Sequence, residues 1–553
     1  MCTERKGHNA RRPAFSPPLT YQSTNNNNPT NLFKMRKNLF QISALLATGI
    51  VAGSLSAAAQ TERIVKLTTG KAVGSEITLL VNHTYEGVTV DWGDGNPVAY
   101  NTGRDAIREV TGTVKGSQIT ITGDDMWDML SCAGCGLTAI DLEGAKGLKS
   151  LYVQNNELTT ISLKGMEQLT DFNASNNALT TIEYTNPSYP ENDLKSIENF
   201  NVSNNSLSGT FVIRTASLTS ADISYNKYST IYLSSNSKLD MLNCAGNALK
   251  SLPISSCKNI TTLVCSDNAL TSLTLPSGIA TLQQLVADNN KIRNKMDLSA
   301  SASLYDLSVA NNAITQLVLP ASTRLSTLAI EGNSLTFNSL PKSAQKPGYL
   351  SFMPQARHDI SKYENVQTSA DGVPYMPVVT WAERTSATSI LNLNDLRYIG
   401  VTETSSGTPE AVINWIAVDA EGNETPLTKG TTSSAPNDYY YSNGKTAFFT
   451  PHGKVYARIQ GNKLYPDYYV DTTPIAIGSD MVTGIGQAEV ETGKTLTVVG
   501  MKGQLQMSSQ DAAAVNIVSI DGKQVWSGTV SGTVTINLPA GMYVAGGVKA
   551  IVK

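Results

Sequence analysis

The chain has 553 residues, and a domain averages about 150, so three or four domains are expected and a single small fold is excluded. Lys and Arg number 42 against 45 Asp and Glu, and a formal charge of −3 excludes the basic footprint of a nucleic-acid binder. The four histidines are far apart in sequence, which disfavours a metal cage or a histidine-based catalytic centre. We therefore expect a protein that is not an enzyme, has no cofactor and binds no nucleic acid. The 42 glycines and the low charge favour a mainly β, turn-rich chain.

Residues 1–59 are predicted to form a leader that ends in a signal peptide. The basic segment that begins at Met35 is followed by an apolar stretch over residues 39–55 and by three alanines that end at Ala59. This order is typical of a secretory signal, with cleavage after Ala59. Glycine and serine interrupt the apolar stretch, which is shorter than the roughly 20 residues of a membrane span. The sequence thus predicts a protein that is secreted or held on the outer cell surface.

A repeat occupies residues 126–345. An asparagine recurs two residues before an aliphatic or tyrosine side chain, mostly at intervals of 21 or 22 residues. This column consists of Cys135, Asn156, Asn177, Asn205, Asn226, Asn247, Asn268, Asn290, Asn312 and Asn333. In all ten coils the residues eight, five and three positions before it are apolar, and the last two share the inward face of a short strand. The interval of 28 before Asn205 predicts a loop at residues 186–190 that bulges from one coil.

These columns resemble the leucine-rich repeat, L-x-x-L-x-L-x-x-N/C-x-L. The resemblance implies a solenoid of ten coils, with one continuous parallel sheet and buried asparagines that satisfy backbone groups at the turn after each strand. The second half of each coil alternates apolar and polar residues, so we expect an extended outer side without long helices. Each coil needs a neighbour to cover its apolar columns, so both ends need caps.

The outward positions of the strands, four and two residues before the asparagine column, are the candidate ligand positions. They are mostly small and neutral polar residues. The candidates are Tyr152, Gln154, Asn173, Asn201, Asp222, Asn243, Asp288 and Glu331. Two interpretations stay open: a solvated sheet without a ligand, and a shallow surface that binds a protein or a glycan.

The cysteines are expected to be structural. Cys132 and Cys135 form a C-x-x-C pair, but both fall in columns of the repeat, and a zinc site needs a second ligand pair. Cys244 and Cys265 share a column in adjacent coils, where parallel side-chain directions make a disulfide unfavourable. We predict small buried side chains rather than a metal site or a disulfide framework.

Residues 60–125 are predicted to form an N-terminal β cap. Asp91–Gly95 resembles the W-G-D-G hairpin of modules of the polycystic-kidney-disease type. Two aspartates in a glycine-rich loop also suit calcium, but a tight hairpin explains the same residues. We favour the hairpin.

Two further β modules follow the repeats. Residues 346–480 alternate strand-like runs with turns at the spacing of an immunoglobulin-like sandwich. Its tyrosines, which include Tyr439–Tyr441, Tyr465 and Tyr469, either stack on sugars or pack a strand face. Residues 481–553 resemble the C-terminal sorting domain of type IX secretion cargo in Bacteroidetes-type bacteria, on Asp521-Gly522-Lys523 and L-x-x-G-x-Y-V from Leu538.

These features together predict an exported, mainly β leucine-rich-repeat protein, a monomer that binds another protein in adhesion or host interaction. The alternative is a glycan-binding surface protein that uses the tyrosines of the sandwich. The C-terminal resemblance implies contact with outer-membrane secretion machinery. The identity of the ligand does not follow from the sequence.

Overall fold

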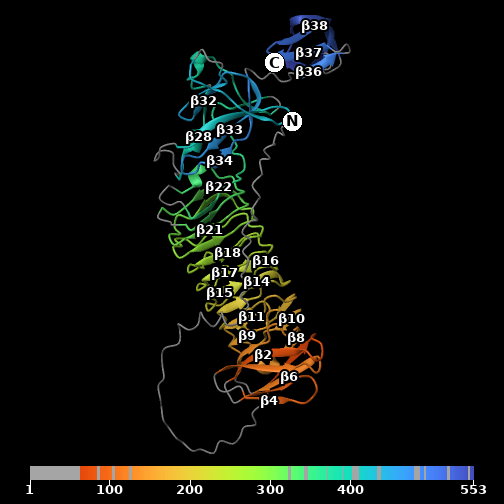
Figure 1. Cartoon of the computed structure of the whole chain (residues 1–553), viewed down its shortest axis with the longest axis vertical. Coiled ribbons are helices and arrows are strands. Elements are labelled where there is room, and N and C mark those ends of the chain that lie inside the picture. The colour runs from red at the N-terminus through yellow and green to blue at the C-terminus, as the bar shows by residue number, and fades with distance from the viewer. Residues whose placement is uncertain are drawn as a thin grey trace, which may run out of the picture. The chain divides into compact units, whose positions relative to one another are not determined.

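A computed structural model describes residues 63–83, 87–101, 106–123, 127–321, 325–341, 347–369, 372–388, 390–400, 410–432, 437–478, 486–490, 494–519, 523–545 and 548–552. Strands dominate these residues, with a few short 3-10 turns (Figure 1). The predicted signal peptide, Asp521 and Gly522 lie outside the described residues.

The N-terminal cap continues into the repeats on both sides of the first coil. Its strands are β1 (Arg63–Thr69), β2 (Glu76–His83), β3 (Val88–Asp91), β4 (Val98–Tyr100), β5 (Ile107–Thr113) and β6 (Gln118–Gly123). The β2–β5 pair joins the repeat sheet through β7 (Trp127–Ser131), and β1 pairs with β8 (Leu137–Asp141). Both pairings are antiparallel, so the parallel sheet ends against strands of the cap instead of exposing an open edge.

Asp91–Gly95 forms a tight turn between β3 and β4. The Asp91 carboxylate oxygen Oδ1 accepts hydrogen bonds from the backbone N–H groups of Gly93, Asp94 and Gly95 at 2.9–3.1 Å. Trp92 is buried, and its indole N–H donates to the Tyr100 hydroxyl at 3.0 Å. The hairpin interpretation of these residues agrees with this geometry.

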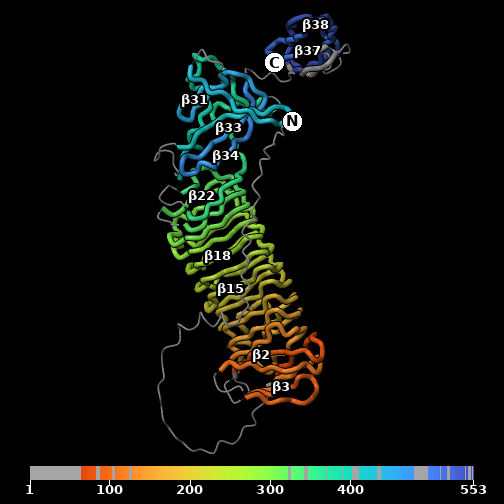
Figure 2. The backbone as a smooth tube through the Cα atoms, viewed as in Figure 1, coloured from red at the N-terminus to blue at the C-terminus, as the bar shows by residue number. Residues whose placement is uncertain are grey.

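The repeats form a leucine-rich-repeat solenoid in which each coil supplies one short strand to a parallel sheet (Figure 2). After β7 these strands are β9 (Ser150–Tyr152), β11 (Asp171–Asn173), β13 (Asn199–Asn201), β15 (Ser220–Asp222), β17 (Met241–Asn243), β18 (Thr262–Val264), β19 (Gln284–Val286), β21 (Asp306–Ser308), β23 (Thr327–Ala329) and β24 (Tyr349–Ser351). Equivalent residues pair in register, for example Leu242 with Leu263. The described side chains of the three apolar columns are buried in this part of the core.

The outer side of the solenoid is extended, as the alternation in each coil predicts. Its strands are β10 (Thr160–Ser162), β12 (Thr181–Glu183), β14 (Ser208–Val212), β16 (Lys227–Tyr232), β20 (Arg293–Asp297) and β22 (Ala313–Val318). They pair two by two as β10–β12, β14–β16 and β20–β22. The 3-10 turns η1 (Glu143–Ala145), η2 (Pro190–Asn192) and η3 (Phe337–Ser339) complete the solenoid.

Strand β24 adds an eleventh coil beyond residue 345, where the sequence placed the end of the repeats. Leu350 pairs with Leu328, and Phe352 is buried where the other coils carry their third apolar residue. Gln355 stands 22 residues after Asn333 and takes the place of the ladder asparagine. The pattern of asparagines ends at Asn333 because a longer amide side chain serves the same purpose here.

The next module is a two-sheet sandwich. One sheet contains β25 (Gln367–Thr368), β26 (Pro374–Met376), β28 (Val412–Val418), β29 (Glu424–Pro426), β33 (His452–Gln460), β34 (Tyr469–Asp471) and β35 (Ile475–Ile477); the other contains β27 (Leu391–Asn392), β30 (Lys429–Gly430), β31 (Tyr439–Ser442) and β32 (Lys445–Phe448). Turns η5 (Trp381–Glu383) and η6 (Asn394–Arg397) connect them. Trp415 is buried edge-on against Phe448, with ring centroids 4.8 Å apart. The sandwich also contacts the last coil, because the Tyr468 hydroxyl donates to the Leu350 carbonyl at 3.0 Å.

The C-terminal strands form an antiparallel module with its own core. They are β36 (Gly486–Val490), β37 (Lys494–Met501), β38 (Gln504–Ser519), β39 (Gln524–Asn537), β40 (Gly541–Ala545) and β41 (Val548–Val552). Val498, Met507 and Ile517 are fully buried in this core. No helix in the described part of the chain is long and apolar enough to cross a membrane.

Candidate functional site

The asparagine column forms a hydrogen-bonded ladder between successive coils. Each asparagine from Asn156 to Asn333 donates from Nδ2 to a carbonyl of the preceding coil at 2.9–3.0 Å. Its Oδ1 accepts a backbone N–H of the preceding coil at 2.9–3.0 Å. Gln355 repeats both contacts, to the Ile330 carbonyl and the Leu335 N–H. Because these backbone groups have no strand partner at the turn, the side-chain amides stabilise the stack.

Cys135 begins this column without an amide. Its thiol contacts the Thr78 carbonyl at 3.7 Å, and burial raises its pKa to about 11. Burial also raises the pKa of Cys132. All five cysteines of the repeats are free and buried. A redox or nucleophilic centre needs a stabilised thiolate. Burial disfavours the thiolate of both Cys132 and Cys135, so the C-x-x-C pair does not suit such a centre.

A second column, one residue before the ladder, forms the turn that follows each strand. Its ten residues have φ between 52° and 68°, the left-handed region. They are Gly134, Asn155, Asn176, Asn204, Tyr225, Gly246, Asp267, Asn289, Asn311 and Gly332. Nine of the ten are glycine, asparagine or aspartate, the residues that tolerate this conformation. This signal was present in the sequence and was missed there.

Tyr225 is the exception in that column. It is 52% exposed at a φ of 52°, where a bulky residue is strained. Its ring lies over Gly246, since a Cβ on Gly246 would be 2.6 Å from the ring. An exposed aromatic ring is thus held in place at the end of strand β15.

Four of the predicted ligand positions shape their own turns. Asn173, Asn201, Asp222 and Asn243 accept, through Oδ1, the backbone N–H two residues later at 3.0–3.2 Å. Three of them also accept a serine hydroxyl. Burial raises the pKa of Asp222 against these hydrogen bonds. These side chains are half-buried and are partly occupied in holding the turn.

The side chains two residues before the ladder are less exposed to solvent than the alternation of the strand predicts. Ser175, Ser203, Ser224, Ala245, Ser266 and Ala310 are buried, and Gln154, Asp288 and Glu331 are half-buried. Asp288 accepts the Ala310 N–H and the Ser308 hydroxyl at 2.7 Å, and burial raises its pKa to about 6. The turn that follows each strand covers this column, so it adds little to an open surface.

The position six residues before the ladder, which is the first residue of each strand from β9 to β24, also points outward, and sequence reasoning missed this column. It includes Met241, 45% exposed, and Tyr349, 49% exposed. Tyr305, 48% exposed, immediately precedes β21, and Tyr225 follows β15. We call the strand face the outward positions of the coils from β7 to β24, which lie seven, six, four, two and one residues before the ladder column. Tyr152, Met241, Tyr305, Tyr349 and Tyr225 belong to it.

The strand face carries a strongly unequal charge. It holds nine carboxylates and one lysine, Lys149. The carboxylates are Asp128, Asp171, Glu198, Asp222, Asp240, Asp267, Asp288, Asp306 and Glu331. Elsewhere in residues 127–321 and 325–341 there are eight carboxylates and eleven lysines and arginines. The overall charge of −3 hides this segregation, because the outer side of the solenoid and the rest of the chain carry a net positive charge.

Neutral donors hold several of these carboxylates. Lys149 pairs with Asp128 at 2.7 Å, whereas Asp222, Asp267 and Asp288 accept from serine hydroxyls or an asparagine amide. Asp306, for example, accepts the Gln284 amide at 2.8 Å, and Asp240 accepts the Thr261 hydroxyl at 2.6 Å. Neutral donors orient a carboxylate without cancelling its field.

The tyrosines of the sandwich are mostly occupied. Tyr439 and Tyr465 are buried, and the Tyr465 hydroxyl donates to the Pro341 carbonyl at 2.6 Å. Tyr440 packs edge-on against Trp381, while Tyr469 stays exposed beneath the Arg458 guanidinium, 4.4 Å from its ring centre. These residues do not form one open aromatic platform for a sugar.

No group of three or more metal-ligating side chains lies together in the described residues. No protein-family model and no curated protein matches the sequence. Solved structures do resemble the fold. The functional domain of InlJ from Listeria monocytogenes has 15% identity and a TM-score of 0.32, over 63% of this chain and 90% of that chain. YopM from Yersinia enterocolitica has 20% identity and a TM-score of 0.26, over 42% of this chain and 66% of that chain.

Internalin C2 from Listeria monocytogenes is similar at 24% identity and a TM-score of 0.24, over 34% of this chain and 73% of that chain. With TM-scores this low, these likenesses carry no argument about the role of this chain. The function has to be argued from the strand face itself.

Proposed function

We propose that the chain is an exported, non-enzymatic binding protein whose strand face captures a basic protein at the cell surface or in the medium, as in adhesion or host interaction. The observation that carries this proposal is the charge of the strand face, nine carboxylates against one lysine. A face of one sign attracts partners of the opposite sign, speeds their association and excludes acidic competitors.

Exposed apolar side chains supply the contacts that charge alone does not. Met241, Tyr305, Tyr349 and Tyr225 are each 45–52% exposed on this face. Aromatic side chains are frequent anchors of protein interfaces, because they bury a large area at a low entropic cost. The hydrogen-bonded coils keep these side chains in fixed places, so little conformational freedom is lost on binding.

Export is part of the proposal and rests on the sequence. A signal that begins at Met35 and ends at Ala59 would deliver a mature chain that begins at Gln60, which amino-terminal sequencing of the exported protein tests. The C-terminal module, strands β36 to β41, is proposed to act as a sorting domain. Deletion of residues 482–553 should then trap a folded protein in the periplasm, whereas unchanged secretion would contradict this role.

The strand face is tested with two variants of equal charge. Glu198→Lys with Asp240→Lys reverses two exposed carboxylates on the face, and Glu364→Lys with Glu421→Lys reverses two exposed carboxylates elsewhere. The probe is cytochrome c, a basic protein, with lysine-acetylated cytochrome c as its neutralised control. We expect the first variant to bind cytochrome c at least tenfold more weakly at low salt, about 1.4 kcal/mol, and the second to bind like the unchanged protein. Equal loss in both variants would contradict a role for this face.

A further inference from the structure

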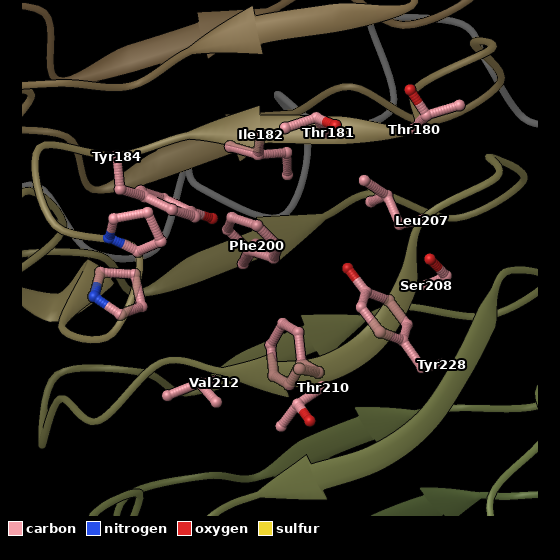
Figure 3. Close-up of a pocket in the computed structure, with 13 residues that line it drawn as sticks. Thr180, Thr181, Ile182, Tyr184, Phe200, Leu207, Ser208, Thr210, Val212 and Tyr228 are labelled. Carbon is pink, nitrogen blue, oxygen red and sulfur yellow. The ribbon is translucent and has the colours of Figure 1, made fainter.

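A cavity of about 280 Å³ opens on the outer side of the solenoid, away from the strand face (Figure 3). It lies between strands β12 and β14, in the coils that precede and follow the interval of 28 residues. Phe200 lies between these strands, and Pro187 and Pro190 of the intervening loop also line the cavity.

The extra residues separate the two coils on the outer side only. On the strand face β11 and β13 pair in register, and the Ser206 N–H still donates to the Leu179 carbonyl at 2.8 Å. On the outer side β12 pairs with β10 and β14 pairs with β16, but β12 and β14 do not pair with each other. Each of these two strands therefore has an edge without a strand partner in the described part of the chain.

The lining of the cavity is uncharged and combines aromatic rings with hydroxyl groups. None of its thirteen residues carries a charge. The rings of Phe200, Phe211 and Tyr228 follow one another with centroids 5.8–5.9 Å apart. The desolvation of a charged ligand would be uncompensated here, whereas an apolar side chain would replace water on the rings.

Hydroxyl groups are the polar side-chain groups of the cavity, which Thr180, Thr181, Ser208 and Thr210 line together with two tyrosines. The hydroxyls of Tyr184 and Tyr228 point toward one another across the ring of Phe200 (Figure 3). Neither has a hydrogen-bond partner among the described residues. Burial raises the pKa of both phenols, so they stay neutral and can donate to a carbonyl of a ligand.

Hydrogen bonds hold the loop at residues 186–190, which borders the cavity without filling it. Asp193 is buried and accepts the N–H groups of Thr185 and Gly165 at 2.7 Å. The Arg214 guanidinium donates to the Ser188 carbonyl at 3.2 Å. The site is therefore formed before a ligand arrives.

We propose that this gap binds an extended, uncharged segment of another protein, which pairs with the free edge of β14 and inserts one aromatic or aliphatic side chain into the cavity. The two free strand edges favour a polypeptide, because only a peptide backbone offers the alternating N–H and C=O groups that a strand edge pairs with. The volume is slightly below the usual range of small-molecule sites, and one side chain is a suitable occupant. This site is independent of the strand face and would add a second point of contact.

The test uses the full chain and four twelve-residue peptides of Ser, Thr and Val that carry one central Phe, Tyr, Leu or Ala. We expect the first three to bind at least tenfold more tightly than the Ala peptide. N-methylation of alternate backbone amides should weaken binding at least tenfold, because it blocks strand pairing. Thr210→Trp fills the cavity from an exposed position, and Thr230→Trp, exposed on β16 but outside the lining, is its matched control.

Thr210→Trp should abolish peptide binding with an unchanged circular dichroism spectrum, and Thr230→Trp should leave it intact. Tyr228→Phe, which keeps the ring, should weaken binding severalfold. The proposal is overturned if no peptide binds, if Thr210→Trp binds like Thr230→Trp, if N-methylation has no effect, or if methyl glycosides bind in place of the peptides. Reversal of Glu198 and Asp240 on the strand face should leave peptide binding unchanged, which separates this site from the proposed function.

Discussion

Replacement of Asn247 by leucine tests the hydrogen-bonded ladder in the middle of the solenoid. Asn247 accepts the Tyr228 N–H at 2.9 Å and donates to the carbonyls of Ile223, Cys244 and Ala245 at 3.0–3.2 Å. The Cys244 carbonyl also accepts from Asn268, the Ala245 carbonyl from the Tyr225 N–H, and the Ile223 carbonyl from Asn226. The substitution therefore leaves one group without a partner, the Tyr228 N–H.

Each orphaned buried group costs about 1–3 kcal/mol. Because Asn247 is only half-buried, water can reach part of the site, and we expect a loss of about 1–2 kcal/mol. For a unit of roughly 200 residues this corresponds to a melting temperature lower by roughly 2–8 °C. The Tyr228 amide should also exchange its hydrogen at least tenfold faster than in the unchanged protein.

Lys250→Leu is the matched control, since Lys250 is exposed in the same coil. It introduces the same side chain without removing a ladder contact, so we expect a change below about 0.5 kcal/mol. Thermal melts followed by circular dichroism, together with hydrogen exchange read by mass spectrometry, compare the two variants. An Asn247→Leu protein that melts with the control and keeps the Tyr228 amide protected would refute the ladder as a source of stability.

Three further predictions concern stability and reactivity. Gln355→Leu should destabilise the last coil by about 1–3 kcal/mol and speed hydrogen exchange at Leu335, whereas an unchanged Leu335 amide would show that Gln355 does not continue the ladder. The pKa of Asp288 is raised from 3.8 to about 6, so the folded state binds more protons than the unfolded state between these values, and the contribution of Asp288 to stability should rise as pH falls from 7 to 4. Asp288→Asn should remove this pH dependence and stabilise the protein at pH 7 by about 2 kcal/mol. Urea melts at both pH values compare the two proteins. The five cysteines of the repeats are buried, with the pKa of Cys265 raised to about 12, so iodoacetamide at pH 8 should leave them unmodified until the protein unfolds; rapid labelling of the native protein would contradict this environment.

The solenoid was predictable because each coil meets nearly the same surroundings as its neighbours. Ten repetitions of three apolar columns and one ladder position leave a parallel stack as the arrangement that buries all of them. Gln355 was missed because the search followed asparagine alone. The ladder requires a side-chain amide, which glutamine also supplies. Phe352, an apolar residue three positions before Gln355, was the signal in the sequence that the repeat continues.

The candidate site was only partly predictable. Strand alternation indicated which side chains point outward, but not that the turn after each strand covers Ser203 and Ala310. The acidity of the strand face emerges only when charges are added column by column, since the overall composition averages them away. The cavity beside Phe200 follows from the effect of seven additional residues on the neighbouring outer strands, which depends on three-dimensional packing.

Oxidative footprinting of the protein in complex with a captured basic partner tests the central claim most directly. Met241, Tyr305 and Tyr349 lie on the strand face, and Tyr189 and Tyr232 are equally exposed outside it. Strand-face binding predicts that the partner protects the first three side chains from hydroxyl radicals and leaves the other two reactive. Protection of Tyr189 and Tyr232, with Met241, Tyr305 and Tyr349 still oxidised, would contradict the assignment of the binding surface.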